Sequence, residues 1–81
     1  MIHKVDKAVG GVIRRLRTRN NLTQQGLAER VGLSYQQVQK YETGETRISV
    51  SRLFDIAEAL GSEAHVIVKL TEFDLKAKKE F

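Results

Sequence analysis

The sequence predicts an all-α fold of four to five short helices followed by one C-terminal β-strand. Apolar residues recur three and four positions apart over most of residues 9–60, which is the spacing of one buried helix face. Proline, which breaks helices, is absent from all 81 residues. The pattern changes after Gly61, where the run Ala-His-Val-Ile-Val-Lys-Leu is β-branched and lacks helical spacing, and this change predicts a strand over residues 64–70.

Composition limits the chain to one small domain with a basic start. There is no cysteine, so disulfides and thiolate metal sites are excluded, and we expect a cytoplasmic protein. The chain has neither an apolar run of membrane-spanning length nor a signal-peptide core, so we expect no membrane association. The net charge is +4, and residues 1–20 alone carry six Lys or Arg against one Asp, which is +5. This excess indicates an anionic partner such as a phosphate backbone, although a solvated charged face is the alternative.

The first helix is predicted to begin with Asp6 as its cap and to run to about Arg19, after a loose arm over residues 1–5. Gly10 and Gly11 lie inside this helix and each weakens it by up to about 1 kcal/mol relative to alanine. A glycine pair in a helix indicates either close packing or a helix that begins loosely, and we expect the loose start. The Asn20-Asn21 pair is expected to end the helix.

Residues 23–43 predict two short helices joined by a tight turn. Thr23 is expected to cap the first, through about Arg30, and Gly32 suits the turn. Ser34 is expected to cap the second, through about Glu42. This is the layout of a helix-turn-helix, in which one helix supports the next and the second reads a DNA groove.

Helical geometry divides the second of these helices into two sides. At 100° per residue, Val38 and Tyr41 define the buried side. Glu42 lies near that buried side, where a carboxylate needs a partner. The outer side is polar and carries Gln36, Lys40 and Thr43, with Gln39 beside them and Tyr35 and Gln37 on the flanks.

The last predicted helix begins at Ser49 or Ser51, runs through about Leu60 and stops at Gly61. A lone strand would have unpaired edges, so this segment is either an aberrant helix or a strand that pairs with something, for which a twofold-related copy of the same strand would serve. Beyond it, residues 71–81 are charged and expected to fray, although Phe73, Ala77 and Phe81 have helical spacing. We therefore divide the chain into a DNA-binding domain over residues 1–61 and a dimerisation strand and tail over residues 62–81.

Residues 12–61 also resemble a known family, the lambda-repressor/Cro-like helix-turn-helix of the xenobiotic-response-element family of bacterial regulators. Each matching piece is short, and it is their order and spacing together that carry the resemblance. The pieces are Ile13-Arg14, Leu16-Arg17, Leu22-Thr23-Gln24, Leu27-Ala28, Val31-Gly32-Leu33-Ser34, Val38, Tyr41-Glu42, Gly44, Leu53, Ile56-Ala57 and Ala59-Leu60.

The resemblance implies roles for individual residues. Arg17 would pair with Glu42, and Gln24 would contact a phosphate and brace the reading helix. The base-reading residues implied are Tyr35, Gln36, Gln39 and Lys40, and the other phosphate contacts are Thr43, Arg47 and Arg52. Glutamine can bond to adenine and lysine to guanine in the major groove. The same side chains could also be ordinary surface residues, and Tyr35 departs from the small polar residue or glutamine of many relatives.

The expected function is that of a sequence-specific regulator of double-stranded DNA, a repressor acting as a homodimer on a pseudo-palindromic operator. The dimer contact is expected from Phe54, Val66, Val68 and Leu70, together with Phe73. Two alternatives stay open: an antitoxin that also binds a toxin protein, and a protein-interaction adaptor that reuses the fold.

We expect neither an enzyme nor a metal or cofactor site. His3 and His65 are far apart in sequence and have no cluster of ligands around them. Ser34 and Ser49 have no evident catalytic base, and Gly10-Gly11 is too short for a phosphate-binding loop.

Overall fold

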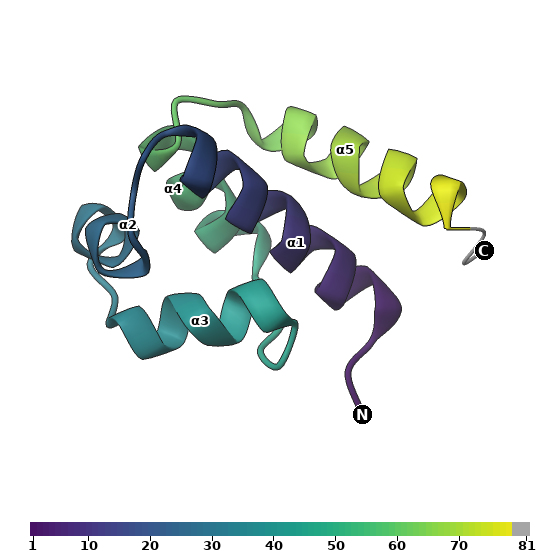
Figure 1. Cartoon of the computed structure of the whole chain (residues 1–81), viewed down its shortest axis with the longest axis horizontal. Coiled ribbons are helices and arrows are strands. Elements are labelled where there is room, and N and C mark those ends of the chain that lie inside the picture. Colours follow the sequence, from purple (N-terminus) through teal and green to yellow (C-terminus); the bar gives the residue numbers. More distant parts are fainter. Residues whose placement is uncertain (79–81) are drawn as a thin grey trace.

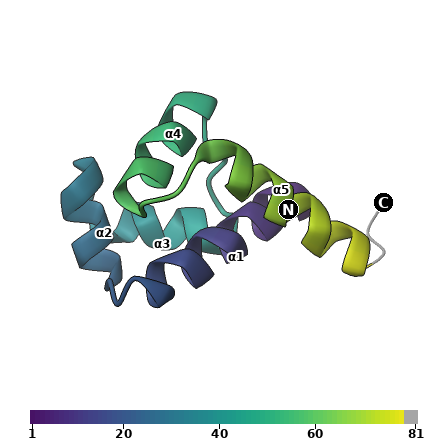
Figure 2. The same ribbon diagram turned by 90° about the horizontal axis from the view of Figure 1, so that it is seen from above.

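A computed structural model describes residues 1–78, which form five helices and no strand. The helices are α1 (Lys4–Arg19), α2 (Gln24–Val31), α3 (Tyr35–Thr43), α4 (Val50–Ala59) and α5 (Ala64–Ala77). The long helix α1 lies between α3 on one side and α5 on the other, while α2 packs on α3 and α4 (Figure 1). Seen from above, α5 runs over the first half of α1 (Figure 2). The helix-turn-helix is thus held against one side of α1.

Threonine and serine side chains cap the start of three helices, α2, α3 and α4. Thr23 Oγ1 accepts a hydrogen bond from the Gly26 amide at 2.9 Å, and Ser34 Oγ accepts one from the Gln37 amide at 3.2 Å. Both predicted caps are therefore confirmed. Ser49, the first of the two serines considered, caps α4. At the turn between α2 and α3, Gly32 has a φ of 71°, a left-handed conformation that costs glycine little.

The predicted start of α1 was wrong, because the helix begins at Lys4 and its cap is His3. The Val5 amide donates to His3 Nδ1 at 3.1 Å, so the imidazole fills the role expected of Asp6. Asp6 lies in the first turn instead, and the helix continues through Gly10 and Gly11. Gly10 is buried against α3, so at this position the glycine reflects close packing, the alternative that we did not favour.

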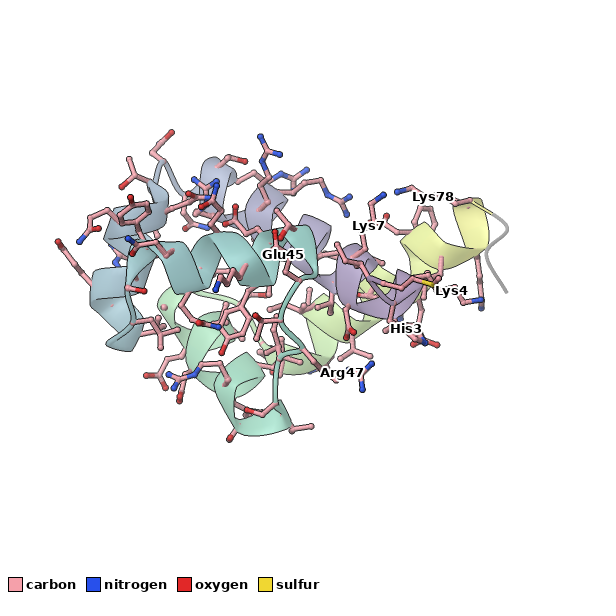
Figure 3. The ribbon with its side chains drawn as sticks, turned by 90° about the horizontal axis from the view of Figure 1, so that it is seen from below. His3, Lys4, Lys7, Glu45, Arg47 and Lys78 are labelled. Atoms are coloured by element: carbon pink, nitrogen blue, oxygen red, sulfur yellow. The ribbon has the colours of Figure 1, made fainter. Side chains whose placement is uncertain are left out.

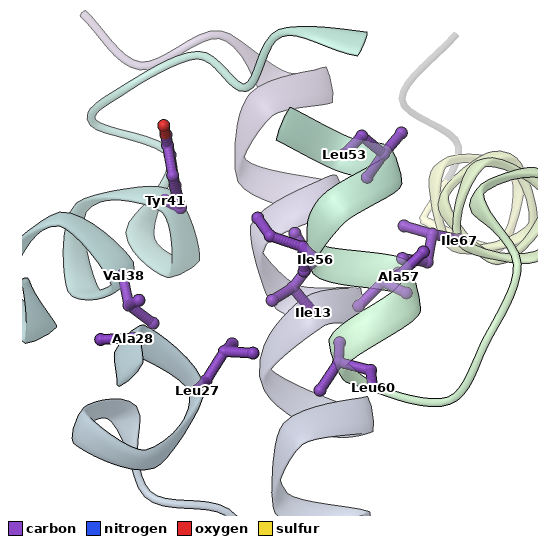
Figure 4. Close-up of a cluster of buried hydrophobic side chains, with 11 residues drawn as sticks. Ile13, Leu27, Ala28, Val38, Tyr41, Leu53, Ile56, Ala57, Leu60 and Ile67 are labelled. Atoms are coloured by element: carbon purple, nitrogen blue, oxygen red, sulfur yellow. The ribbon is translucent and has the colours of Figure 1, made fainter. Parts of the chain in front are cut away.

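The core is built by all five helices around Ile13, Leu27, Ile56 and Ile67, which are at most 1% exposed (Figure 4). Leu27 brings α2 and Val38 brings α3 into this cluster. Because Ile67 belongs to α5, the C-terminal segment completes the same core as the helix-turn-helix.

The predicted strand over residues 64–70 was also wrong, since this segment is the first half of α5. Ile67, Thr71 and Leu75 are four residues apart and all buried, so the segment does have a helical face. The helix penalty of the β-branched residues is only a few tenths of a kcal/mol each, about 0.5, and burying that face outweighs it. The expected fraying after Thr71 is wrong through Ala77, where α5 ends, while Phe81 lies outside the described residues.

Candidate nucleic-acid interface

The outer side of α3 presents a row of exposed polar side chains. Tyr35, Gln36, Gln39 and Lys40 are exposed, whereas Val38 is only 2% exposed. Within residues 1–78, none of the four exposed side chains takes part in a hydrogen bond or an ion pair. The structure therefore brings the four expected base-reading residues together on one helix, with donors and acceptors that are open to a ligand.

A buried polar network fixes the opposite side of α3. Arg17 Nε donates to Glu42 Oε2 at 2.6 Å and Arg17 Nη2 to Glu42 Oε1 at 3.1 Å, with the two side chains 11% and 3% exposed. Gln24 Nε2 also donates to Glu42 Oε1, at 3.0 Å, and Arg17 Nη1 donates to the Leu22 carbonyl at 2.8 Å. The carboxylate of Glu42 thus joins α1, α2 and α3, and its charge is compensated within the core.

The side chains expected to hold phosphates border the polar row, but several of them have partners within the protein. Thr43 is exposed at the end of α3, and its hydroxyl donates to the Lys40 carbonyl at 3.2 Å. Arg52, in the first turn of α4, donates to the Val31 carbonyl at 3.3 Å. Gln24 is half-buried at the start of α2, where its amide group faces Glu42.

Arg47 lies in the loop between α3 and α4, with its guanidinium toward the first turn of α1 (Figure 3). Its Nε donates to both carboxylate oxygens of Asp6, at 3.1 and 3.3 Å. The Arg47 side chain is nevertheless 73% exposed, so its remaining donors face solvent. Asp6 therefore orients this cation without enclosing it.

The residues expected in the dimer contact are divided by the helical course of α5. A strand would have placed Val66, Val68 and Leu70 on one face, but in a helix Val68 lies about 160° from each of the other two. Val66 and Leu70 are half-buried, while Val68 is exposed. Phe54 of α4 is 61% exposed and shares a surface hollow with Ala64, one turn before Val68.

Sequence reasoning missed three features of this region. One is the His3 cap, and a second is the pairing of Asp6 with Arg47. The third is the placement of Lys7 and Arg14 on one exposed face of α1. Their spacing of seven residues was a signal that could have identified this last feature.

No helix among residues 1–78 combines the length and the apolar character needed to cross a bilayer. His3 is engaged as a helix cap, and His65 Nδ1 lies 3.7 Å from a Glu63 carboxylate oxygen at the exposed start of α5.

Comparisons with known proteins show that the sequence is similar to those of transcriptional regulators. The sequence model of the helix-turn-helix family matches residues 13–67. The chain is 58% identical over 59 residues to an uncharacterized transcriptional regulator in the ATPase CF(0) region of Rhodospirillum rubrum, covering 73% of this chain and 55% of that protein. It is 48% identical over 60 residues to the helix-turn-helix-type transcriptional regulator RC0668 of Rickettsia conorii, covering 74% and 48%. The chain thus spans about half the length of these curated relatives.

Solved structures share the fold. The restriction-modification controller protein C.AhdI from Aeromonas hydrophila is 31% identical, with a TM-score of 0.73, over 75% of this chain and 92% of that one. The clp gene regulator ClgR from Corynebacterium glutamicum is 24% identical, with a TM-score of 0.86, over 94% of this chain and 83% of that one. The likeness to ClgR concerns the fold alone.

Proposed function

Because this chain belongs to the helix-turn-helix family of bacterial transcriptional regulators, of the xenobiotic-response-element type, we propose that it is a sequence-specific repressor. It binds double-stranded DNA as a homodimer, in the cytoplasm, on a pseudo-palindromic operator. The relatives named as transcriptional regulators and as a controller protein support regulation rather than catalysis.

The observation that carries this proposal is the unpaired polar row on α3. Gln36, Gln39 and Lys40 are exposed and without side-chain partners among the described residues. Base-reading side chains are expected to be unpaired in this way when no DNA is bound. Glutamine pairs with adenine N6 and N7, and lysine donates to guanine N7 and O6. Tyr35 begins the same row and offers its ring to a thymine methyl or a sugar.

The bordering residues Gln24, Thr43, Arg47 and Arg52 are assigned to backbone phosphates, which fix the register of α3 in the groove. Each lies at the start of a helix, at the end of one or in the loop between α3 and α4. The Glu42 network supports this assignment, because it holds the start of α2 and the end of α3 at a fixed separation.

A second copy of the chain is assigned to the exposed apolar side of α4 and α5. Phe54 and Val68 supply this contact, since both are exposed. Phe54 shares a surface hollow with Ala64, and Val68 follows Ala64 by one helical turn. Val66 and Leu70 lie on the other side of α5, where both are half-buried and Leu70 packs against the core. One module covers half a site, so two copies place their α3 helices about one turn of DNA apart, roughly 34–36 Å.

Selection of binding sites from random duplex DNA, combined with sedimentation of the protein, tests this function. We expect an enriched motif with two inverted half-sites and a dimer at micromolar concentration. The Phe54→Ser and Val68→Ser variants should sediment as monomers. Phe73, which was expected in the contact from sequence, is 68% exposed but lies about 140° from Val68 around α5, so the proposed contact leaves it out and Phe73→Ser is the control.

The outcomes separate the proposal from the adaptor alternative. Binding to all duplexes with no enriched sequence would overturn sequence-specific regulation and favour an adaptor. Enrichment by a protein that stays monomeric at high micromolar concentration would overturn the dimer.

A further inference from the structure

A groove of about 340 Å³ lies beside the polar row, where α1, the end of α3 and the end of α5 meet. Its walls include Lys7, Gly11 and Arg14 from α1, Thr43 from α3, and Asp74 and Lys78 at the end of α5. Figure 3 shows Lys7 and Lys78 near one another at this end of the molecule.

The charges of the groove do not cancel. Glu42 is occupied by Arg17 and Gln24, and Asp74 accepts from Arg15 Nη1 at 2.8 Å. Lys7 and Arg14 make no side-chain hydrogen bond or ion pair with any other described residue, and both are exposed. The two acidic groups are thus already compensated, and the groove keeps an excess of positive charge that attracts anions.

The groove is continuous with the polar row through Thr43. This residue follows Lys40 by three positions, one helical turn, and lines the groove directly. A DNA strand that leaves the base-reading part of α3 would therefore meet Thr43 and then the cations of α1. Repeating phosphates are the anions that match a groove with several cations along one wall.

We propose that Lys7 and Arg14 bind consecutive backbone phosphates of the DNA that flanks each half-site, with the groove seating that strand. This assignment rests on the proposed function and extends its footprint onto α1. Gly11 stands between the two cations, and a Cβ built there has no atom within 4 Å. Its missing side chain leaves the floor open, so the strand can approach the helix backbone closely.

The salt dependence of binding tests this extension. In the Lys7→Gln/Arg14→Gln double variant, the slope of log affinity against log salt should become shallower by about 1.8, because each phosphate contact contributes about 0.9. Sequence preference should stay unchanged, since phosphate contacts do not read bases. The control is Arg19→Gln, which removes one of the positive charges of exposed α1, against two in the double variant, and lies about 140° from Arg14.

A second variant separates binding from folding. Gly11→Glu fills the open floor and places a carboxylate between the two cations, so binding should weaken on every duplex. The thermal midpoint should not fall, because glutamate is the better helix former and nothing occupies that space.

Measurements on both the selected operator and a random duplex keep the two proposals distinguishable. An unchanged salt slope in the double variant, or unchanged binding by Gly11→Glu, overturns the groove as a phosphate site even if the operator is still preferred. If the unmodified protein shows no preference for an operator, the proposed function is overturned. The salt slope of the double variant on the random duplex still tests whether the groove binds phosphates.

Discussion

Gly10 of α1 lies so close to Tyr41 of α3 that no Cβ fits between the glycine and the tyrosine carbonyl oxygen. The next carbonyl oxygen, that of Glu42, would be 2.6 Å from the same Cβ. The two helices therefore meet backbone to backbone at the position from which Glu42 reaches Arg17.

The two adjacent glycines should respond oppositely to alanine. Gly10→Ala should destabilise the fold by about 1–3 kcal/mol, because the backbone of α3 has to move. Gly11→Ala should stabilise it by up to about 1 kcal/mol, since its Cβ meets nothing and alanine favours a helix. Thermal unfolding of both variants measures the difference, and a stable Gly10→Ala variant would contradict the close approach.

Removal of the Glu42 side chain should be costly. Glu42→Ala leaves Arg17 buried without its counter-charge, and we expect a loss of about 3–5 kcal/mol of unfolding free energy. The Arg17→Met/Glu42→Leu double variant should recover most of that loss, because it leaves no unpaired buried charge. Urea denaturation of the unmodified protein and of both variants tests this. If Glu42→Ala were as stable as the unmodified protein, the pair would contribute little to stability.

Replacing Gln36 should change which sequence is bound. Gln36→Ala removes one base contact, so affinity should fall by about 1–3 kcal/mol at one base position and preference there should relax. Binding to a set of operators with single-base changes measures this effect. Gln25→Ala is the control, because that exposed glutamine lies on α2 and bonds to Glu29 at 3.2 Å.

Replacing Arg47 should weaken binding to all sequences alike. Arg47→Ala should lower affinity without changing preference and make the salt slope shallower by about 1. Asp6→Asn is the informative partner variant, because it weakens the ion pair but keeps the cation. If Asp6→Asn lowered affinity as much as Arg47→Ala, the loop geometry rather than the charge would be the important factor.

Substitutions in α5 should lower the free energy of unfolding only when they change its buried face. Ile67→Ala should cost about 2–5 kcal/mol, since the side chain is fully buried between α5 and the core. Phe73→Ala should change stability by about 0.5 kcal/mol or less, because this ring is 68% exposed. Chemical denaturation compares them, and similar costs would argue against the observed packing of α5.

Features governed by neighbours in sequence could be predicted. Thr23 and Ser34 cap helices through amides three residues ahead, so the local pattern sufficed to place both helices. The expectation of a buried Arg17–Glu42 pair came from helical geometry together with the family resemblance. The resemblance also implied that Gln24 braces the reading helix, but it did not identify Glu42 as the partner of the Gln24 amide, because that contact depends on how α2 and α3 cross.

The C-terminal helix could not be predicted because its buried face includes a polar residue. Thr71 lies between Ile67 and Leu75 on that face, and its hydroxyl donates to the Ile67 carbonyl at 2.8 Å. This bond gives the buried threonine hydroxyl a partner inside the core. In the sequence, however, a polar residue at this position interrupts the apolar spacing that indicates a helix. The Asp6–Arg47 pair was equally inaccessible, since its members are 41 residues apart.

The burial of Ile67 in the common core also has a consequence for synthesis on the ribosome. A nascent chain that has emerged only as far as Leu60 holds the helix-turn-helix but lacks the side chain that closes the core beside Ile13 and Ile56. The apolar surface of α1 and α4 then stays open until α5 has left the exit tunnel. Folding of this domain is therefore completed only when α5 docks on α1.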